Sequence, residues 1–538
     1  MADTDVEDDG EVDYAIVGAG AAGCVLANRL SASGRQQVAV LEAGGPDRDI
    51  FIKIPAGFTR TVNDPALNWG YETAPGPHIG GRRIVYPRGR VLGGSSSING
   101  HLYVRGQAYD YDTWAQLGCR GWSWTDVLPY FKRAESRASG DPATRGQDGP
   151  LIVEDQRDPH PLSHLFQDAA EGCGLPRNPD YNSGDQEGTC IYQQMMKNGR
   201  RWSAADAFLR PALARPNLRL VMHALAERVE LRDQRAVGVR YRVGDRVKLL
   251  RVRREVVLAG GSINSPQLLQ LSGIGDADWL RPLGIAVAHE LKGVGRNLRD
   301  HYAARVSVRV KGIGSLNERS HGLALGWEVL RYLVQRKGLL TAAPGHAAAF
   351  WRSRPELAVP DVQMLFAPAS YPAGRVGTAS LEREPGMTCG GYQERPESRG
   401  HVKLLSADPR QAPEIQPNYL ADPLDRQVML ALLKFARQLF ATAPLAQHVA
   451  HETFPGPAAA SDEDLLAHAK ATGSTTFHPV GTCKMGSDPE AVVDAKLKLI
   501  GMEGLRVADA SVMPTMVSGN TYAAVVMIAE KAAEAIGA

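Results

Sequence analysis

The N-terminal part of the chain has a pattern of apolar and small residues that predicts three elements in a row. Val12–Val17 is rich in β-branched residues and predicts a strand, Gly18–Gly23 predicts a tight turn, and Cys24–Ser31 predicts a helix. A second apolar run, Val38–Leu41, predicts another short strand, and it ends in Glu42. The order strand, glycine turn, helix and strand predicts a β-α-β unit.

The glycines of this turn have the spacing G-x-G-x-x-G, which is typical of dinucleotide sites. Gly18 permits the tight turn, Gly20 lets the backbone approach a pyrophosphate, and Gly23 lets the helix pack on the strand. The amides at the helix start favour phosphate groups. Glu42 follows Gly23 by 19 residues, which suits a carboxylate that binds ribose hydroxyls and repels a 2′-phosphate. The pattern predicts a dinucleotide other than NADP; a turn without a ligand is the alternative.

A long loop-rich region, 44–110, follows this unit. It contains the tract Gly89–Gly100, in which paired glycines precede three serines. Such residues remove side-chain bulk and present backbone amides, as a loop needs if it is to press against a pyrophosphate or a flat ring. Because long structureless loops usually serve a ligand, we expect this tract to contact the cofactor; an ordinary surface loop is the alternative.

Further strands are predicted in the middle of the chain. Three apolar runs predict strands that rejoin the nucleotide-binding part: Leu218–Met222, Ala226–Leu231 and Arg254–Gly261. Ser262–Gly273 starts with capping residues and a proline and stops at glycine, so it predicts a helix.

The region from about 311 to 471 alternates less regularly. Val362–Phe366 and Gly400–Leu404 predict strands of a mixed sheet. We expect this sheet to cap the nucleotide site and to determine the substrate.

Composition excludes several classes of function. The chain has 538 residues, with Lys+Arg 61 against Asp+Glu 59 and a net charge of +2, so no overall field draws it to nucleic acid. Its six cysteines include no CxxC pair, and we predict no metal site and reduced thiols in a cytoplasmic protein. No apolar stretch approaches the roughly 20 residues of a membrane span, while peripheral membrane contact stays open. We expect residues 1–10, which are acidic and polar, to be a disordered lead.

Two residues near the C-terminus carry candidate chemistry. His478 lies in the proline- and glycine-rich run Thr476–Gly486, and Asn520 follows in Gly519–Thr521. A histidine can accept a proton near neutral pH, and an amide can hold a substrate oxygen. Together with a bound dinucleotide, this pair predicts removal of a hydride and a proton from an alcohol. Cys483 lacks activating partners in the sequence, and we expect a buried structural thiol.

Four segments together carry a family resemblance: the glycine motif at 18–23, the tract at 89–100, the segment 261–275 (GSINSPQLLQLSGIG) and the blocks around His478 and Asn520. From about residue 12 to 535 the chain resembles the glucose-methanol-choline (GMC) oxidoreductases, and within them the bacterial alcohol and choline dehydrogenase branch. The resemblance implies an α/β fold, in which a Rossmann-like FAD-binding domain is interwoven with an α+β substrate-binding cap on a mixed or antiparallel sheet. The implied FAD-binding domain spans 11–155, 196–310 and 472–538, and the cap spans 156–195 and 311–471.

The resemblance also implies which residues bind FAD. They lie at the glycine motif, after the second strand, in the loop tract, at an adenine-side strand and in the C-terminal blocks: Gly18, Gly20, Ala21, Ala22, Gly23, Glu42, Ala43, Trp69, Arg90, Val91, Gly93, Gly94, Ser95, Asn99, Gly100, Val229, Ala259, Asp509, Ala510, Asn520 and Thr521. Some members attach FAD covalently through a histidine in this loop. The matching position here is Ile98, so we expect non-covalent FAD, although His101 lies three positions further on.

The implied reaction is oxidation of an alcohol, expected to be primary, to the aldehyde. His478 would be the general base beside flavin N5, with Asn520 holding the substrate oxygen. We expect a small-molecule alcohol and an electron acceptor, which stays open between O2, a quinone and a carrier protein; the oligomeric state also stays open. A lyase of the hydroxynitrile lyase type, a photodecarboxylase and a non-catalytic FAD-binding protein are the alternatives. His301 fits a family segment near the flavin, but a capping or core role is an equal alternative, so we do not expect it to be catalytic.

Overall fold

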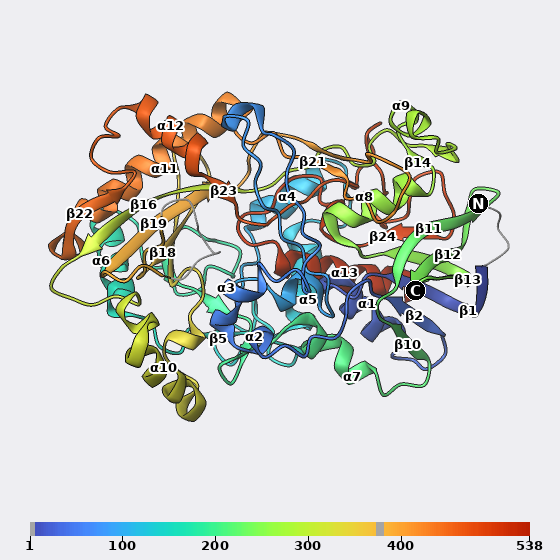
Figure 1. Ribbon diagram of the computed structural model, residues 1–538, viewed down its shortest axis with the longest axis horizontal. Helices are drawn as coiled ribbons and strands as arrows, with labels where there is room; N and C mark the ends of the chain where they lie inside the picture. The colour runs from blue at the N-terminus through green and yellow to red at the C-terminus, as the bar shows by residue number, and fades with distance from the viewer. Residues whose placement is uncertain (1–5, 373–380, 538) are drawn as a thin grey trace.

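The computed structural model, which describes residues 6–372 and 381–537, has two lobes that lie side by side along its longest axis (Figure 1). The first lobe is built on a seven-stranded sheet of order β10-β2-β1-β13-β12-β11, with β24 paired to β13. The second lobe is built on another seven-stranded sheet of order β22-β16-β19-β18-β17-β6, with β23 paired to β16. The chain crosses between the lobes several times, and both of its ends lie in the first lobe (Figure 1).

The first sheet is parallel at its centre. β1 (Val6–Val17), β2 (Val38–Leu41), β10 (Leu218–Val221) and the end of β13 (Arg246–Leu258) run in one direction, together with β24 (Leu505–Val507). All four residues of β2 are buried, as expected for a parallel strand covered on both faces. β11 (Leu225–Arg232) and β12 (Arg235–Val243) add an antiparallel edge.

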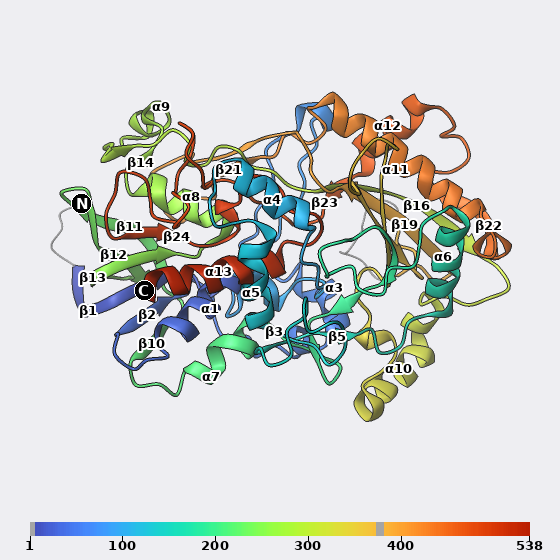
Figure 2. The same ribbon diagram turned by 180° about the vertical axis from the view of Figure 1, so that it is seen from behind.

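Helices cover this sheet, and two of them start at the carboxyl ends of its parallel strands. α1 (Ala21–Leu30) follows β1, and α8 (Gly261–Leu271) follows β13. α13 (Tyr522–Gly537) packs against α1, and α5 (Trp124–Ala134) packs against α13; both appear in front of the sheet when the molecule is seen from behind (Figure 2). The predicted strand, glycine turn, helix and strand are therefore confirmed as β1, α1 and β2.

The neighbouring strands of the second sheet are antiparallel. Its longest members are β16 (Tyr302–Val310), β18 (Val362–Ala367) and β19 (Gly386–Gln393), and it also includes β6 (Gly188–Ile191), β17 (Ala347–Trp351), β22 (Val449–Phe454) and β23 (Ser474–Thr475). α6 (Pro161–Gly172) and α11 (Pro423–Ala441) pack against one of its faces. Side chains alternate along each strand, so every second residue points away from these helices.

Three sequence-based expectations about the fold were wrong. Residues 6–10 are not a disordered lead, because they begin β1 and pair with β13; Asp8 forms an ion pair of 2.8 Å with Arg251 across that pairing. Residues 1–5 of the expected lead lie outside the described residues. The predicted strand at 400–404 is β20 (His401–Lys403), which pairs with β21 (Glu414–Gln416) in a separate two-stranded sheet and not in the cap sheet.

The third correction concerns the domain boundaries. β16 falls inside the range 196–310 that we expected to bind FAD, but it is a central strand of the second sheet. β23, at the start of the range 472–538, also pairs with β16. The reason is pairing between distant segments, since β16 takes its neighbours from residues 386–393 and 449–454.

No helix in the described part of the chain has the length and apolarity needed to cross a bilayer.

Candidate active site

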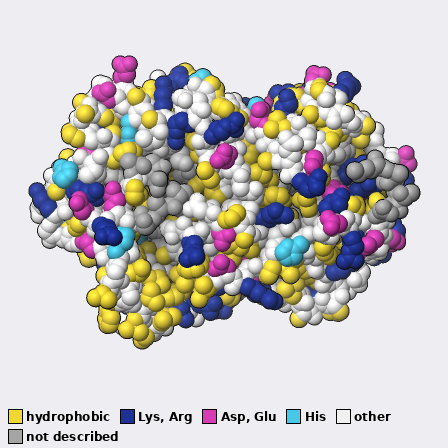
Figure 3. All heavy atoms as spheres, in the orientation of Figure 1, with side chains coloured by type: hydrophobic (Ala, Val, Ile, Leu, Met, Phe, Trp, Pro, Cys, Tyr) yellow, Lys and Arg dark blue, Asp and Glu magenta, His cyan; other side chains and the backbone are white. Residues whose placement is uncertain are grey.

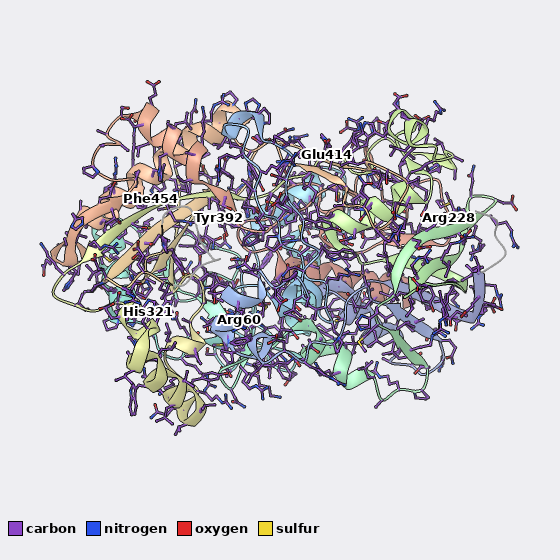
Figure 4. The ribbon with its side chains drawn as sticks, in the orientation of Figure 1. Arg60, Arg228, His321, Tyr392, Glu414 and Phe454 are labelled. Carbon is purple, nitrogen blue, oxygen red and sulfur yellow. The ribbon has the colours of Figure 1, made fainter. Side chains whose placement is uncertain are left out.

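One cavity of about 420 Å³ is lined by both lobes. Its walls include the glycine turn after β1, the end of β2, the tract 94–102, the start of α8, three strands of the second sheet and the segment 474–479. Tyr392, at the side of the second lobe nearest the middle of the molecule (Figure 4), is one of the lining residues. A cavity of this kind between two lobes is a usual place for a ligand site.

The glycine turn leaves room for a phosphate group and offers donors to it. α1 begins at Gly20 without any side-chain cap, so its first amides are free to bind an anion. A Cβ atom at Gly94 would lie 2.7 Å from the Cα atom of Gly20, and one at Gly18 would lie 2.6 Å from the carbonyl oxygen of Ala259. Both glycines have positive φ, +54° and +102°, which other residues rarely adopt. These residues fit the pyrophosphate of a dinucleotide.

Glu42 is held at the end of β2 with its carboxylate in the cavity wall. Its two oxygens accept hydrogen bonds from the amides of Ala19 (2.8 Å) and Gly44 (2.7 Å). Burial raises the pKa of Glu42, and these two amide donors oppose the rise. Each carboxylate oxygen has a further lone pair, so Glu42 can also accept from the hydroxyls of a ribose.

Most residues expected at the cofactor line this one cavity. They come from seven separate segments of the chain: Gly18, Gly20, Ala21, Ala22, Glu42, Ala43, Trp69, Gly94, Ser95, Asn99, Gly100, Ala259, Asp509, Ala510, Asn520 and Thr521. Asp509 also holds protein groups together, because its carboxylate accepts from the amide of Gly261 and the hydroxyl of Ser265, and from both the amide and hydroxyl of Ser511.

Five further residues that we expected at the cofactor are not among those that line this cavity, and their contact with FAD stays a prediction. A Cβ atom at Gly23 would lie 1.8 Å from the carbonyl oxygen of Gly18, so this glycine serves helix packing. The guanidinium of Arg90 lies 5.0 Å from the ring centre of Trp69 and supports that lining residue from outside.

Val91, Gly93 and Val229 are the other expected residues that do not line the cavity. Val91 belongs to a small buried apolar cluster, and the amide of Gly93 donates to Ala19. The amide of Val229 donates to the hydroxyl of Ser272 at 2.8 Å, and residues 224–226 line the cavity in its place.

The loop that carries His478 is held rigidly. The His478 amide donates to Oδ1 of Asp300 at 2.8 Å, and Oδ2 of Asp300 accepts from Tyr86, Tyr419 and Thr475. Phe477, directly before His478, has a positive φ of +68°, a strained conformation that the surrounding structure must impose.

The His478 ring has partners on both nitrogens. Its Nδ1 atom lies 2.9 Å from Nδ1 of His301 and 3.0 Å from Oγ1 of Thr476, and its Nε2 atom lies 3.1 Å from Nδ2 of Asn520. The other nitrogen of His301, Nε2, lies 2.7 Å from the carbonyl oxygen of Glu394. The structure therefore brings His478 and Asn520 together, as expected from the sequence, and adds His301.

These contacts determine which nitrogen of His478 carries the proton. A carbonyl oxygen only accepts, so Nε2 of His301 must donate to Glu394, and Nδ1 of a neutral His301 must then accept. His478 consequently donates from Nδ1, which leaves the lone pair on Nε2, next to the amide of Asn520. Burial lowers the pKa of His478 well below its usual value, so the ring is neutral at pH 7 and can accept a proton at Nε2.

Sequence reasoning did not identify the role of His301. It lies next to Asp300 and directly before β16, and nothing in its neighbours along the chain indicates a contact with a residue 177 positions later. The expectation for Cys483 fits its burial, which raises the pKa of its thiol. Two aromatic residues, Trp69 and Phe477, line the cavity, whereas Tyr103 and Trp202 do not.

Comparisons with known proteins agree with this geometry. Two family models described as GMC oxidoreductase match residues 12–303 and 396–529. The chain is 41% identical over 528 residues to "Oxygen-dependent choline dehydrogenase" of Brucella anthropi, covering 98% of this chain and 95% of the relative. It is also 41% identical over 529 residues to "Alcohol dehydrogenase [acceptor]" of Pseudomonas putida, covering 97% and 95%.

Solved structures show the same fold. Pyridoxine 4-oxidase from Mesorbium loti has a TM-score of 0.87 at 29% identity and covers 97% of this chain and 98% of its own. A formate oxidase variant from Aspergillus oryzae RIB40, in a study of FAD modification, has a TM-score of 0.91 at 27% identity and covers 99% of each chain. The family models span the glycine turn, whose residues fit a dinucleotide, and also the His478 loop. The chain therefore belongs to the GMC oxidoreductases, and its cofactor is FAD.

Proposed function

We propose that this protein oxidises an alcohol to the corresponding carbonyl compound, with primary alcohols giving aldehydes, and that His478 is the general base. The observation that carries the proposal is the pair formed by Nε2 of His478 and the amide of Asn520, 3.1 Å apart on the cavity wall. One group accepts a hydrogen bond and the other donates one, so both can bind a single hydroxyl oxygen at the same time. The two relatives are named as a choline and an alcohol dehydrogenase, which supports this class of substrate.

The residues of the site suit removal of the hydroxyl proton. Nε2 of neutral His478 accepts it, and Nδ2 of Asn520 donates to the substrate oxygen as negative charge develops there. The positive charge that forms on the His478 ring is shared with His301 through their 2.9 Å contact. Bound FAD supplies the acceptor for the hydride that leaves the carbinol carbon.

The chain's own residues also suggest how FAD is held. The free amides at the start of α1, the carboxylate of Glu42 and the tract 94–100 would bind it. Ile98 lines the cavity with an apolar side chain, which cannot form a covalent bond to a flavin. We propose non-covalent FAD; release of all yellow colour on acid precipitation supports this, whereas colour retained in the pellet contradicts it and would point to His101.

An anaerobic reduction experiment tests the proposed reaction. The purified yellow protein is mixed without oxygen with a panel of primary and secondary alcohols, and the flavin absorbance is followed. Alcohol oxidation bleaches the flavin and yields the carbonyl product in equal amount, whereas a lyase or a binding protein leaves the flavin oxidised. Peroxide release compared with dye or quinone reduction then identifies whether O2 or another carrier is the acceptor.

A matched pair of variants tests the base. His478→Gln should slow bleaching by about 100-fold or more, as is typical for loss of a general base. The control is His346→Gln, because His346 is also buried but does not line the cavity. Equal rates in wild type and His478→Gln would refute the assignment of the base.

A further inference from the structure

The second sheet presents one set of alternating side chains to the cavity. Ala303 pairs with Tyr392 and Arg305 pairs with Gly390 between β16 and β19, while Leu365 faces Gly390 from β18. All five line the cavity. A Cβ atom at Gly390 would lie 2.4 Å from Cβ of Arg305, so the glycine opposite leaves the space in which the arginine side chain lies.

Arg305 is a cation without a protein anion. In the described part of the chain its guanidinium takes part in no ion pair and no hydrogen bond, and residues 373–380 contain no Asp or Glu. Burial lowers the pKa of Arg305 to about 10, which still leaves it charged at pH 7. A desolvated cation without a partner is costly, and such a residue in a cavity is a candidate ligand contact.

The other charged groups on the cavity wall already form hydrogen bonds with groups of the protein. Glu42 and Asp509 are the acidic residues among those that line it, and both accept hydrogen bonds from backbone amides. Arg88 donates to the carbonyl oxygens of Pro87 and Phe477. Arg305 is therefore the lining ion, within the described residues, that remains available to a substrate.

The strand geometry gives the approximate distance between Arg305 and His478, the proposed base. The ring centres of Tyr392 and His478 are 5.8 Å apart, and Ala303 pairs with Tyr392. Arg305 is two residues beyond Ala303, which is about 7 Å along a strand. A substrate with its hydroxyl at His478 would reach Arg305 with a group several carbons away.

We propose that Arg305 binds a carboxylate or similar anion at the far end of the alcohol substrate, so that the preferred substrates are hydroxy acids rather than neutral or cationic alcohols. The proposal rests on the proposed alcohol oxidation and specifies its substrate class. A guanidinium suits this role because it binds a carboxylate through two parallel hydrogen bonds.

The test compares hydroxy acids with their uncharged methyl esters and with a cationic alcohol. Steady-state kcat/KM is measured for ω-hydroxycarboxylates of four, six and ten carbons, for their methyl esters and for choline, with wild type, Arg305→Met and Arg305→Lys. The control is Arg309→Met, because Arg309 lies on the same strand but pairs with Glu382 at 2.6 Å and does not line the cavity. FAD content is measured for every variant.

The wild type should prefer at least one acid over its ester by about 10- to 100-fold, the usual size of a hydrogen-bonded charge contact. Arg305→Met should abolish that preference through KM, Arg305→Lys should retain part of it, and Arg309→Met should keep it. Oxidation of esters and acids at equal efficiency would overturn the anion site and leave alcohol oxidation standing. Loss of FAD alone in Arg305→Met, without a change in preference, would also overturn it. No bleaching by any alcohol would overturn the proposed function itself.

An independent feature lies on the surface of the second lobe. α10 (Gly322–Gln335) presents apolar side chains to solvent, and the exposed fractions of Leu323, Trp327 and Val334 are 96%, 65% and 73%. Leu330 and Leu333 are exposed beside them. These five residues, the α10 ridge, recur at the helical period along one face, and Figure 3 shows apolar atoms gathered where α10 lies in Figure 1.

The inner face of α10 is the polar one. Its buried residues are Glu328 and Tyr332; Glu328 accepts from Arg319 and from the amide of Leu339, and Arg331 pairs with Asp158 at 3.0 Å. A surface helix normally buries its apolar face. Here the polar face attaches α10 to the second lobe, so the α10 ridge is not needed to hold the helix in place. The α10 ridge can therefore contact a partner.

Cations gather at the C-terminal end of this helix. Arg336 and Lys337 follow α10, and the turn between Lys197 and Arg200 lies against Arg336, because a Cβ atom at Gly199 would be 2.7 Å from the Arg336 carbonyl oxygen. None of these four cations forms an ion pair with a described residue, although Arg336 lies 4.8 Å from the ring centre of Tyr332 and Lys197 lies 4.6 Å from that of Trp202. Exposed leucines and a tryptophan beside unpaired cations match the composition of helices that lie in a membrane interface.

We infer that the α10 ridge inserts into the surface of a bilayer that carries anionic headgroups, with the four cations over the headgroups. The holoenzyme is sedimented with vesicles of phosphatidylcholine alone and with added phosphatidylglycerol. The triple variant Leu323→Ser, Trp327→Ser, Leu333→Ser is compared with the control Leu117→Ser, Leu405→Ser, whose leucines are exposed elsewhere.

Wild type and control should bind the anionic vesicles, less tightly at high salt, and the triple variant should bind at least about 10-fold more weakly. Equal binding of wild type and triple variant, or no binding by wild type, would overturn the inference. A wild-type dimer that the triple variant dissociates, without vesicle binding, would overturn it in favour of a second copy of the chain. Activity on soluble alcohols should be unchanged in both variants.

Discussion

Replacing His301 with phenylalanine removes both of its ring nitrogens while keeping a planar side chain of similar size. In the native protein the His301 ring stacks on Tyr392 with centres 4.3 Å apart, and phenylalanine can keep this contact. The variant leaves Nδ1 of His478 with one acceptor, Oγ1 of Thr476 at 3.0 Å, where it had two. The hydrogen bond that favours a proton on Nδ1 is therefore partly lost, and a fraction of His478 would carry its proton on Nε2.

The size of the effect follows from one hydrogen bond. A net contribution of about 0.5–1.5 kcal/mol corresponds to a fall in kcat/KM of about 2- to 12-fold. A second effect acts on pH dependence. His301, whose pKa burial lowers to about 3, is neutral in the assay range and accepts from Nδ1 of the charged His478 ring at 2.9 Å, so its removal should lower the pKa of His478 further.

The assay is kcat/KM for one alcohol from pH 4.5 to 9 with a dye acceptor. Activity requires neutral His478, so wild-type activity should fall only well below pH 6.5 as the pH decreases. The acid limb of His301→Phe should move to lower pH, because the charged His478 ring loses an acceptor. His301→Asn, whose amide oxygen can accept from Nδ1, should recover part of the rate, and His346→Phe controls for loss of a buried histidine elsewhere. An unchanged acid limb together with an unchanged rate in His301→Phe would refute the argument about the tautomer.

Three further predictions concern the cofactor, the amide and the thiols. Gly94→Ala should purify with little FAD, because its Cβ atom would lie 2.7 Å from Gly20 Cα. The control Gly326→Ala, whose Cβ atom would meet nothing within 4 Å, should keep its FAD. FAD content is measured by the ratio of flavin to protein absorbance, and equal content in both variants would contradict the proposed FAD-binding role of this turn. Asn520→Ala should lower kcat by about 100-fold, the usual loss for a donor at a developing oxyanion, with KM changed less; a pure KM effect would assign Asn520 to binding alone. Under native conditions a thiol reagent should modify at most Cys173. The other five cysteines are buried, and burial raises the pKa of their thiols. Rapid modification of a second thiol before unfolding would disprove this.

The parts of the site that the sequence predicted are those whose geometry is local. A strand, a glycine turn and a helix in direct succession place Gly18, Gly20 and the first amides of α1 together, whatever the rest of the chain does. Glu42 ends the next strand, so its position also depends on a short segment. Some residues expected at the cofactor, such as Arg90 and Val229, do not line the cavity but lie close in the chain to residues that do. A pattern of residues does not specify which neighbour faces inward.

The sequence by itself therefore determined the β-α-β unit, the dinucleotide motif and the candidates His478 and Asn520, because short segments and their spacing set these features. Only the tertiary structure decided that β16 joins the second sheet, that His301 fixes the tautomer of a histidine 177 residues away, and that Arg305 faces the cavity. Strand pairing and side-chain contacts between distant segments depend on the packing of the whole chain. The free energy of that packing is shared among many residues, so no single stretch of sequence reveals it.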